Sequence, residues 1–222
     1  MNRQRARLVL LLCLLPALPP LRGMFEASMA LLMLVQLPCL FAAGCLAPAL
    51  LPARHHARHH ARLVVRLRPY ALTLFVIASV AYGVWMLPIA LDLSRMSRAL
   101  GVARDIAACV AGLAMVIAVR GAPWPLVLFF GGNMVWMGLT FGMLFVDAQT
   151  RLCANYLLGD QRIAGIGLMA YAIAGCAWLL VWAARQAETA RSVVHQKKLK
   201  KSGRLPIKAA SEKGPDKSKS PA

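Results

Sequence analysis

Long runs of apolar residues alternate with short polar segments along this chain, and their lengths predict helices that cross a lipid bilayer. A helix needs roughly 20 apolar residues to cross a hydrocarbon core of about 30 Å. Four runs reach this length, at residues 25–51, 70–91, 123–146 and 163–184. Two weaker runs cover residues 102–119, which begin near Arg104 and Asp105, and residues 8–21, which hold three prolines. The pattern predicts an all-α bundle of about six transmembrane helices.

The composition agrees with a location in lipid. Hydrophobic residues make up 59% of the 222 residues and charged residues 15%. A soluble domain is nearer half apolar and a quarter charged, so this balance excludes an ordinary soluble enzyme and an intrinsically disordered chain.

The basic residues predict the orientation of the spans. Lys and Arg number 26 against 8 Asp and Glu, for a net charge of +18. With six spans, 20 of the 26 fall on one side: at the N-terminus, in the loop 54–68, at Arg120 and in the tail after residue 184. Cytoplasmic segments carry such an excess, so both termini are expected inside. We therefore expect a multi-pass protein of the bacterial inner membrane that does not bind nucleic acid.

The composition also divides the chain into three parts. Residues 1–23 are expected to form a short span or a signal-anchor, and residues 24–184 the transmembrane bundle. Residues 185–222 are rich in Lys, Ser, Pro and Gly, which predicts a disordered cytoplasmic tail. Eleven basic and three acidic residues give this tail a charge of +8, which attracts anionic lipids.

Four of the five histidines, His55, His56, His59 and His60, stand in the segment RHHARHHAR. In a helix they would form pairs four residues apart, a spacing that can bind a divalent metal, although the arginines between them repel a cation. A weak surface metal site and a basic segment at the membrane interface both remain open. The fifth, His195, lies in the tail, so no predicted span supplies a histidine ligand and haem is not expected.

Ionisable residues are rare in the predicted spans. Glu26, Arg104, Asp105, Asp147 and Asp160 all stand near span ends. Proton pumps and ion-coupled transporters place such groups deep in the bilayer. We therefore expect an interior without a buried charge pair.

Methionines are frequent, at eleven in the chain. Two groups each stand within one run: Met24, Met29 and Met33, and then Met134, Met137 and Met143. Because thioethers are soft ligands that suit Cu(I), we take Met29, Met33 and Met86 as the candidate metal ligands. The alternative is that methionine fills irregular gaps between apolar helices.

Small residues and cysteines indicate structural roles. The segments GLTFG (138–142) and GIG (165–167) are typical of surfaces at which membrane helices pack closely. The six cysteines form no Cys-x-x-Cys pair and mostly fall inside apolar runs, which gives no support to a disulfide framework.

Three stretches carry a further similarity: MFEASMALLMLVQLPCLFAAGCLAP, VWMLPIALD and YLLGDQRIAGIGLMA. They resemble segments of the CtaG-type cytochrome c oxidase assembly factors, named for caa(3)-type oxidases. The matching motif positions are Trp85, Pro88, Asp160, Gln161, Gly165 and Met169.

The histidines of that family are absent from this chain. Phe25 and Met29 stand where the family has one pair, Met86 where it has a histidine after tryptophan, and Gly101 and Asp105 near the later pair. The metal or haem chemistry of those histidines therefore does not carry over.

The resemblance implies a non-enzymatic membrane protein that assists maturation of a haem–copper oxidase, with copper as a cofactor or cargo and oxidase subunits as partners. The alternative is a small transporter or permease component, which predicts a polar path through the bundle.

Three of the motif residues also have structural interpretations. Asp160 stands at the mouth of the last span, where its carboxylate is expected to accept hydrogen bonds from free backbone N–H groups and to face the positive end of the helix dipole, or else to bind a partner or ion. Trp85 and Pro88 are expected to form an interfacial anchor and a helix terminator.

Overall fold

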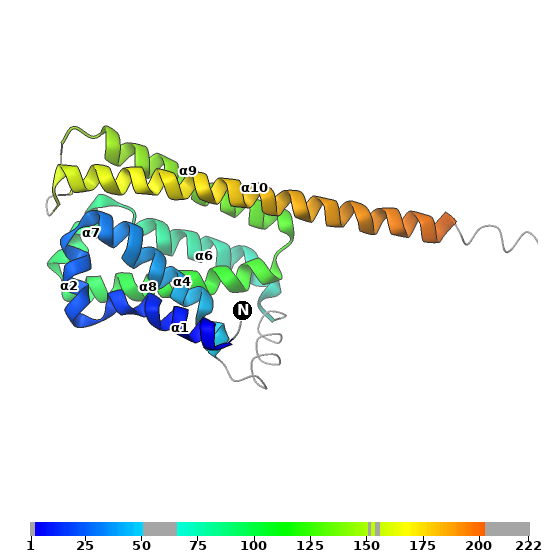
Figure 1. The fold of residues 1–222 in the computed structure, drawn as a ribbon, viewed down its shortest axis with the longest axis horizontal. Coiled ribbons are helices and arrows are strands. Elements are labelled where there is room, and N and C mark those ends of the chain that lie inside the picture. The colour runs from blue at the N-terminus through cyan, green and yellow to red at the C-terminus, as the bar shows by residue number, and fades with distance from the viewer. Residues whose placement is uncertain (1–2, 51–65, 151, 154–155, 203–222) are drawn as a thin grey trace, which may run out of the picture. The chain divides into compact units, whose positions relative to one another are not determined.

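The computed structural model describes residues 3–50, 66–150, 152–153 and 156–202 (Figure 1). All regular secondary structure in these residues is helical, as the sequence predicts. Four helices are long and apolar enough to cross a membrane: Met29–Leu46, Arg98–Gly121, Trp124–Asp147 and Leu158–Thr189. Two bent pairs of helices reach the same length together, so the described residues contain 4 to 6 candidate spans.

The first bent pair lies at the start of the chain. Helix α1 (Arg3–Leu14) and a 3-10 turn (Leu15–Ala17) lead into α2 (Pro19–Ala27), and the axis turns by 67°. The cause is local, because Leu18 precedes a proline and takes the extended conformation that this position favours, with φ −67° and ψ 138°.

A second break divides the predicted run 25–51. Ser28 is extended, with φ −119° and ψ 129°, and it separates α2 from α3 (Met29–Leu31). The helix then widens into a π-helical segment, η2 (Leu32–Gln36), before α4 (Leu37–Leu46) and η3 (Ala47–Leu50). Pro38 has no N–H to donate and crowds the carbonyl of Leu34. That carbonyl instead accepts a hydrogen bond of 2.9 Å from the Tyr171 hydroxyl.

The second bent pair spans the predicted run 70–91. A 3-10 turn, η4 (Arg68–Tyr70), precedes α6 (Ala71–Val84), and α7 (Pro88–Met96) follows at an angle of 70°. Leu87 is extended and Pro88 occupies the first turn of α7. Helix α6 has already ended at Val84, so Pro88 begins the next helix, and its predicted role as a helix terminator stays a prediction.

Three long helices complete the described chain: α8 (Arg98–Gly121), α9 (Trp124–Asp147) and α10 (Leu158–Ser202). At several glycines, the backbone of one of these helices lies very close to the backbone of a neighbouring helix. A Cβ atom on Gly44 of α4 would overlap the backbone carbonyl of Cys109 in α8, and one on Gly112 would overlap that of Phe41. Gly142 of α9 faces Gly165 of α10 in the same way, so the predicted helix-packing role of GLTFG and GIG is confirmed.

Many of the large apolar side chains on these helices are exposed, including Phe129, Trp136, Ile173 and Trp178. Exposed apolar surface on this scale marks contact with a membrane or a partner. Together with the length of the helices, it indicates a multi-pass membrane-embedded protein.

The chain forms two compact units, Met1–Leu179 and Leu180–Ala222. In the second, α10 continues as helix to Ser202, which differs from the disordered tail expected from residue 185. Residues 183–202 are rich in Ala, Arg, Gln, Glu and Lys, which favour helix. The rest of the expected tail, residues 203–222, lies outside the described residues.

Candidate functional site

Four methionines line one cavity of about 290 Å³ in the first compact unit: Met33, Met86, Met134 and Met137. The remaining lining comes from apolar, small and aromatic residues of α4, α6, α9 and α10, among them Tyr82, Tyr171 and Trp178. The cavity therefore has four methionine side chains on an otherwise largely apolar wall.

Irregular backbone brings two of these methionines to the cavity. Met33 belongs to the π-helical segment η2, and Met86 stands in the break between α6 and α7. Met134 and Met137 are three residues apart on α9, so they share one helix face. In membrane proteins, broken or widened backbone is tolerated where it is buried or lines a cavity, and π segments recur at functional sites.

The cavity is lined by side chains that could offer a metal soft, uncharged ligand atoms. Its lining includes no Asp, Glu, His or Cys side chain, and no group of three such residues among the described ones is placed to hold a metal. The hydroxyl of Tyr171 is occupied by the Leu34 carbonyl. Neutral thioethers are thus the main metal-binding donors, and they suit a monovalent soft ion such as Cu(I) better than a hard divalent one.

The predicted metal ligands divide between two places. Met33 and Met86 line the cavity together. Met29 is fully buried in the same hydrophobic core cluster but is not a lining residue. Met134 and Met137 complete the set, and their grouping within one apolar run was the sequence pattern that could have identified them.

Asp160 caps a helix other than its own. It stands in the first turn of α10, but its carboxylate accepts hydrogen bonds from the Ser28 hydroxyl at 2.8 Å and from the backbone N–H of Met29. It therefore satisfies the N-terminus of α3, the helix that leads into η2. The expected hydrogen bond from a free backbone N–H group is present, but its donor stands 131 residues away along the chain rather than in α10.

The other family-motif residues support the packing of α9 and α10. Gln161 is buried, its amide Nε2 donates to the Phe145 carbonyl at 3.2 Å, and its Oε1 accepts from the Leu152 N–H at 3.0 Å. Gly165 and Met169 both pack against Gly142. These contacts join α9 and α10, and both helices supply lining residues of the cavity.

Trp85 and the histidine segment complete the predicted positions. Trp85 is the C-cap residue that follows the last residue of α6, Val84, and it stands directly before Met86. His55, His56, His59 and His60 lie outside the described residues.

Cys153 lies in the connection between α9 and α10 and is fully buried. Its Sγ donates to the Pro88 carbonyl at 3.7 Å. Burial, with a contribution from Asp92, raises the pKa of this thiol to about 12, so it is a neutral packing group rather than a reactive thiolate.

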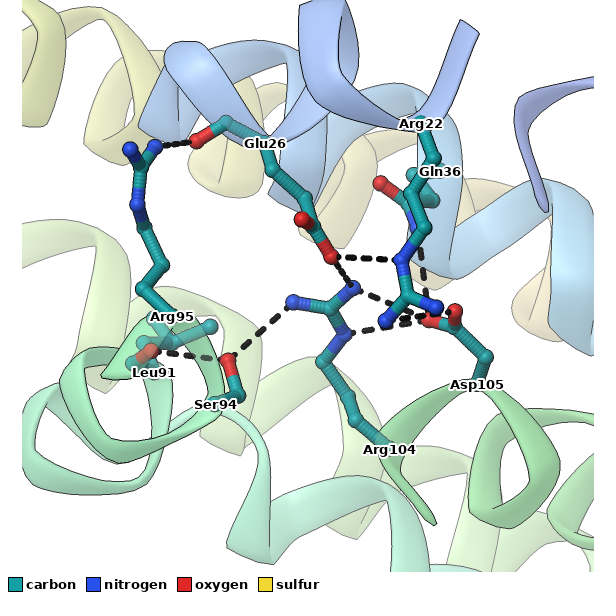
Figure 2. A network of polar contacts seen from close by, with 8 residues as sticks. All are labelled: Arg22, Glu26, Gln36, Leu91, Ser94, Arg95, Arg104 and Asp105. Carbon is teal, nitrogen blue, oxygen red and sulfur yellow. Dashed lines mark hydrogen bonds and ion pairs between the residues drawn. The ribbon is translucent and has the colours of Figure 1, made fainter. Parts of the chain in front are cut away.

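A second feature is a buried network of charged side chains (Figure 2). The fully buried Arg104 of α8 donates from Nη2 to Glu26 of α2 at 2.7 Å, and from Nη2 and Nε to Asp105 at 3.0 and 3.1 Å. Arg22 pairs with the same two carboxylates, at 2.9 Å from Glu26 and 3.4 Å from Asp105.

Polar neighbours complete this network. Arg104 Nη1 donates to the Ser94 hydroxyl at 3.1 Å, and Gln36 Nε2 donates to Asp105 at 3.2 Å. Gln36 is the last residue of η2, so the π-helical segment that holds Met33 also contacts the charge network.

The expectation of an interior without a buried charge pair is therefore wrong. Arg104 is near the start of the predicted run 102–119, but α8 begins at Arg98, which places Arg104 about 9 Å along the helix. The bent segment α2 then supplies Glu26 and Arg22. The hydropathy pattern of one helix does not predict which side chains of another helix it contacts.

No family model, curated protein or solved structure matches this chain.

Proposed function

We propose that this chain is a non-enzymatic membrane protein that holds Cu(I) at thioether sulfur and assists maturation of a haem–copper oxidase. The observation that carries the proposal is the convergence of Met33, Met86, Met134 and Met137 on one cavity. The proposed role in oxidase maturation rests on the three sequence stretches that resemble oxidase assembly factors.

The donor set supports copper over other metals. Thioether ligands carry no charge, so a monovalent ion leaves a single positive charge in the apolar cavity, whereas a divalent ion would need anionic partners to offset its desolvation. Copper here is cargo or cofactor, and the methionines hold it without changing its oxidation state.

We further propose that the protein has six spans in the bacterial inner membrane, with both termini in the cytoplasm. In this arrangement each bent pair counts as one span. The distribution of basic residues along the sequence supports the orientation. A phosphatase that is active only outside the cytoplasm, fused after residue 202, is expected to stay inactive; an active fusion would reverse the orientation.

A competition titration tests the copper site. The full-length protein in detergent is titrated with Cu(I) against a chromogenic chelator, beside the Met33→Leu/Met86→Leu variant. The control is Met24→Leu/Met96→Leu, because both of these side chains are exposed and neither lines the cavity. We expect at least a tenfold weaker affinity in the first variant and the wild-type value in the control. Equal affinity in all three proteins would refute the site.

A cellular experiment tests the oxidase part. Cells that lack the gene are grown under copper limitation and complemented with wild-type protein or either double variant. We expect terminal oxidase activity and the haem difference spectrum to recover with the wild type and the exposed-methionine control only. Normal oxidase levels without the gene would refute the assembly role.

The buried charge network favours a second candidate, a small transporter or permease component. Such a protein needs a polar path, and Arg104, Glu26 and Asp105 form a buried polar cluster. The cavity beside this cluster shares no lining residue with the methionine cavity, so the two cavities do not form one path. Transport is therefore the weaker of the two proposed functions. Solute flux into vesicles that contain the purified protein, lost in Glu26→Gln, would support it.

A further inference from the structure

A second cavity, of about 340 Å³, lies where the two bent segments meet the start of α8. Arg22 and Glu26 of α2, Ser94 and Arg95 of α7, and Arg98 of α8 line it. Three guanidinium groups against one carboxylate make this a cationic cavity, and none of its residues lines the methionine cavity.

The charged network beside this cavity is already neutral without Arg95 and Arg98. Glu26 accepts from Arg22 at 2.9 Å and from Arg104 at 2.7 Å, and Asp105 pairs with the same two arginines. Arg22, Arg104, Glu26 and Asp105 thus sum to zero. The charges of Arg95 and Arg98 are left over.

Arg95 is held in place by uncharged partners. One end of its guanidinium donates to the backbone carbonyl of Glu26 (Figure 2), and the group lies over the ring of Tyr156, 5.3 Å from the centroid. Burial raises the pKa of Tyr156 to about 12, so the phenol adds no negative charge. Arg95 therefore keeps a full positive charge and free N–H donors in a defined position.

Arg98 is exposed, and within the described part of the chain it makes no ion pair or side-chain hydrogen bond. It lines the same cavity as Arg95. Two guanidinium groups on one cavity, neither neutralised, form a ready site for an oxyanion, since planar guanidinium groups bind phosphate through paired hydrogen bonds.

The surroundings of this cavity indicate an amphiphile. Helices α2 and α7 are the second segments of the two bent pairs, each with nine residues and a length of about 14 Å. Met24, Ile89 and Met96 on these helices are exposed and apolar. A cationic cavity beside exposed apolar side chains suits an amphiphile with an anionic headgroup, because the guanidinium groups can bind its phosphate while the apolar side chains contact its hydrocarbon chains.

We propose that this cavity binds the phosphate group of an anionic phospholipid through Arg95 and Arg98, while the lipid chains lie along the exposed apolar side chains of α2 and α7. This site is separate from the proposed copper cavity and does not depend on it. Bound lipid would fix the two bent segments to each other, and its single negative charge would offset part of the excess positive charge.

The test uses native mass spectrometry of the full-length protein in nonionic detergent. The probes are dioctanoyl phosphatidylglycerol, dioctanoyl phosphatidylcholine and inorganic phosphate. We expect one tightly retained phosphatidylglycerol, weaker phosphatidylcholine, and phosphate that competes only at much higher concentration. Phosphate that binds more tightly than phosphatidylglycerol would overturn the lipid as the occupant.

Charge-matched variants separate this site from general attraction to basic protein. We expect Arg95→Gln/Arg98→Gln to weaken phosphatidylglycerol binding by more than about tenfold. Arg98→Gln alone removes no contact within the described residues, so it keeps the fold and is expected to weaken binding about tenfold. The control, Arg162→Gln, removes an exposed arginine of α10 that does not line the cavity. An equal loss in the control, or wild-type binding in Arg98→Gln, would overturn the proposal.

Discussion

Substitution of Arg104 by methionine tests the buried charge network directly. Arg104 is fully buried and lies between two carboxylates, at 2.7 Å from Glu26 and 3.0 Å from Asp105. Methionine has a similar length without the charge. The variant leaves both carboxylates to share Arg22, so the network changes from a net charge of zero to −1 in a buried site.

The expected magnitude follows from this uncompensated charge. Removal of one partner from a buried ion pair costs about 3–5 kcal/mol, because the remaining charge is desolvated without a partner. Arg22 still pairs with both carboxylates, at 2.9 Å and 3.4 Å, which places the expected cost near the lower end, about 3 kcal/mol. A second substitution, Asp105→Asn, restores neutrality in the Arg104→Met background and keeps an acceptor for Gln36.

The free energy of unfolding is measured by titration from nonionic detergent into sodium dodecyl sulfate, with the fluorescence of the five tryptophans as readout. The double variant is expected to be more stable than the sum of the single effects by about 1–3 kcal/mol. The control, Arg162→Met, removes an exposed arginine and should change stability by less than about 0.5 kcal/mol. An Arg104→Met variant as stable as this control, or additive effects in the double variant, would refute the network as a stabilising unit.

Three further predictions concern packing, capping and thiol chemistry. Gly112→Ala should lower the free energy of unfolding by about 1–3 kcal/mol, because the new Cβ would overlap the Phe41 carbonyl. The control Gly132→Ala, whose Cβ meets open space, should raise the free energy of unfolding slightly. Equal effects of the two substitutions in the same titration would contradict the close packing of α4 and α8. Asp160→Asn should cost about 1 kcal/mol through loss of the charged cap on Met29, and wild-type stability would argue against that cap. At pH 8 the thiolate fraction of Cys153 should be about 10⁻⁴, against about a quarter for a free thiol, so maleimide should label it far more slowly in the folded protein than after unfolding; rapid labelling of the folded protein, read by peptide mass spectrometry, would contradict its burial.

The sequence predicts the class of the fold well because the length of an apolar run has a direct physical meaning in a bilayer. The run 123–146 appears as Trp124–Asp147 with almost unchanged bounds. The breaks were harder to place. Pro88 predicts the start of a new helix because the fixed φ of proline suits the first turn. Ser28 has no such constraint, and its side chain bonds instead to Asp160 from a distant part of the chain.

The candidate site is predictable only in part, for the same reason. Soft-ligand chemistry identifies methionine as the residue type, and Met33 and Met86 do reach one cavity. The choice between Met29 and Met134 depends on which helix faces the cavity, and that is decided by the π-helical segment and by the packing of α9 against α10. The buried pairing of Arg104 with Glu26 is likewise a contact 78 residues apart, and no local pattern encodes it.

The most direct measurement of the central claim is copper K-edge X-ray absorption of the full-length protein loaded with one equivalent of Cu(I). We predict a first shell of sulfur, with fewer sulfur neighbours in Met33→Leu/Met86→Leu and an unchanged spectrum in Met24→Leu/Met96→Leu. A first shell of nitrogen or oxygen, as the histidine segment 55–60 would provide, or a sulfur shell unaffected by the cavity substitutions, would contradict the methionine cavity as the copper site.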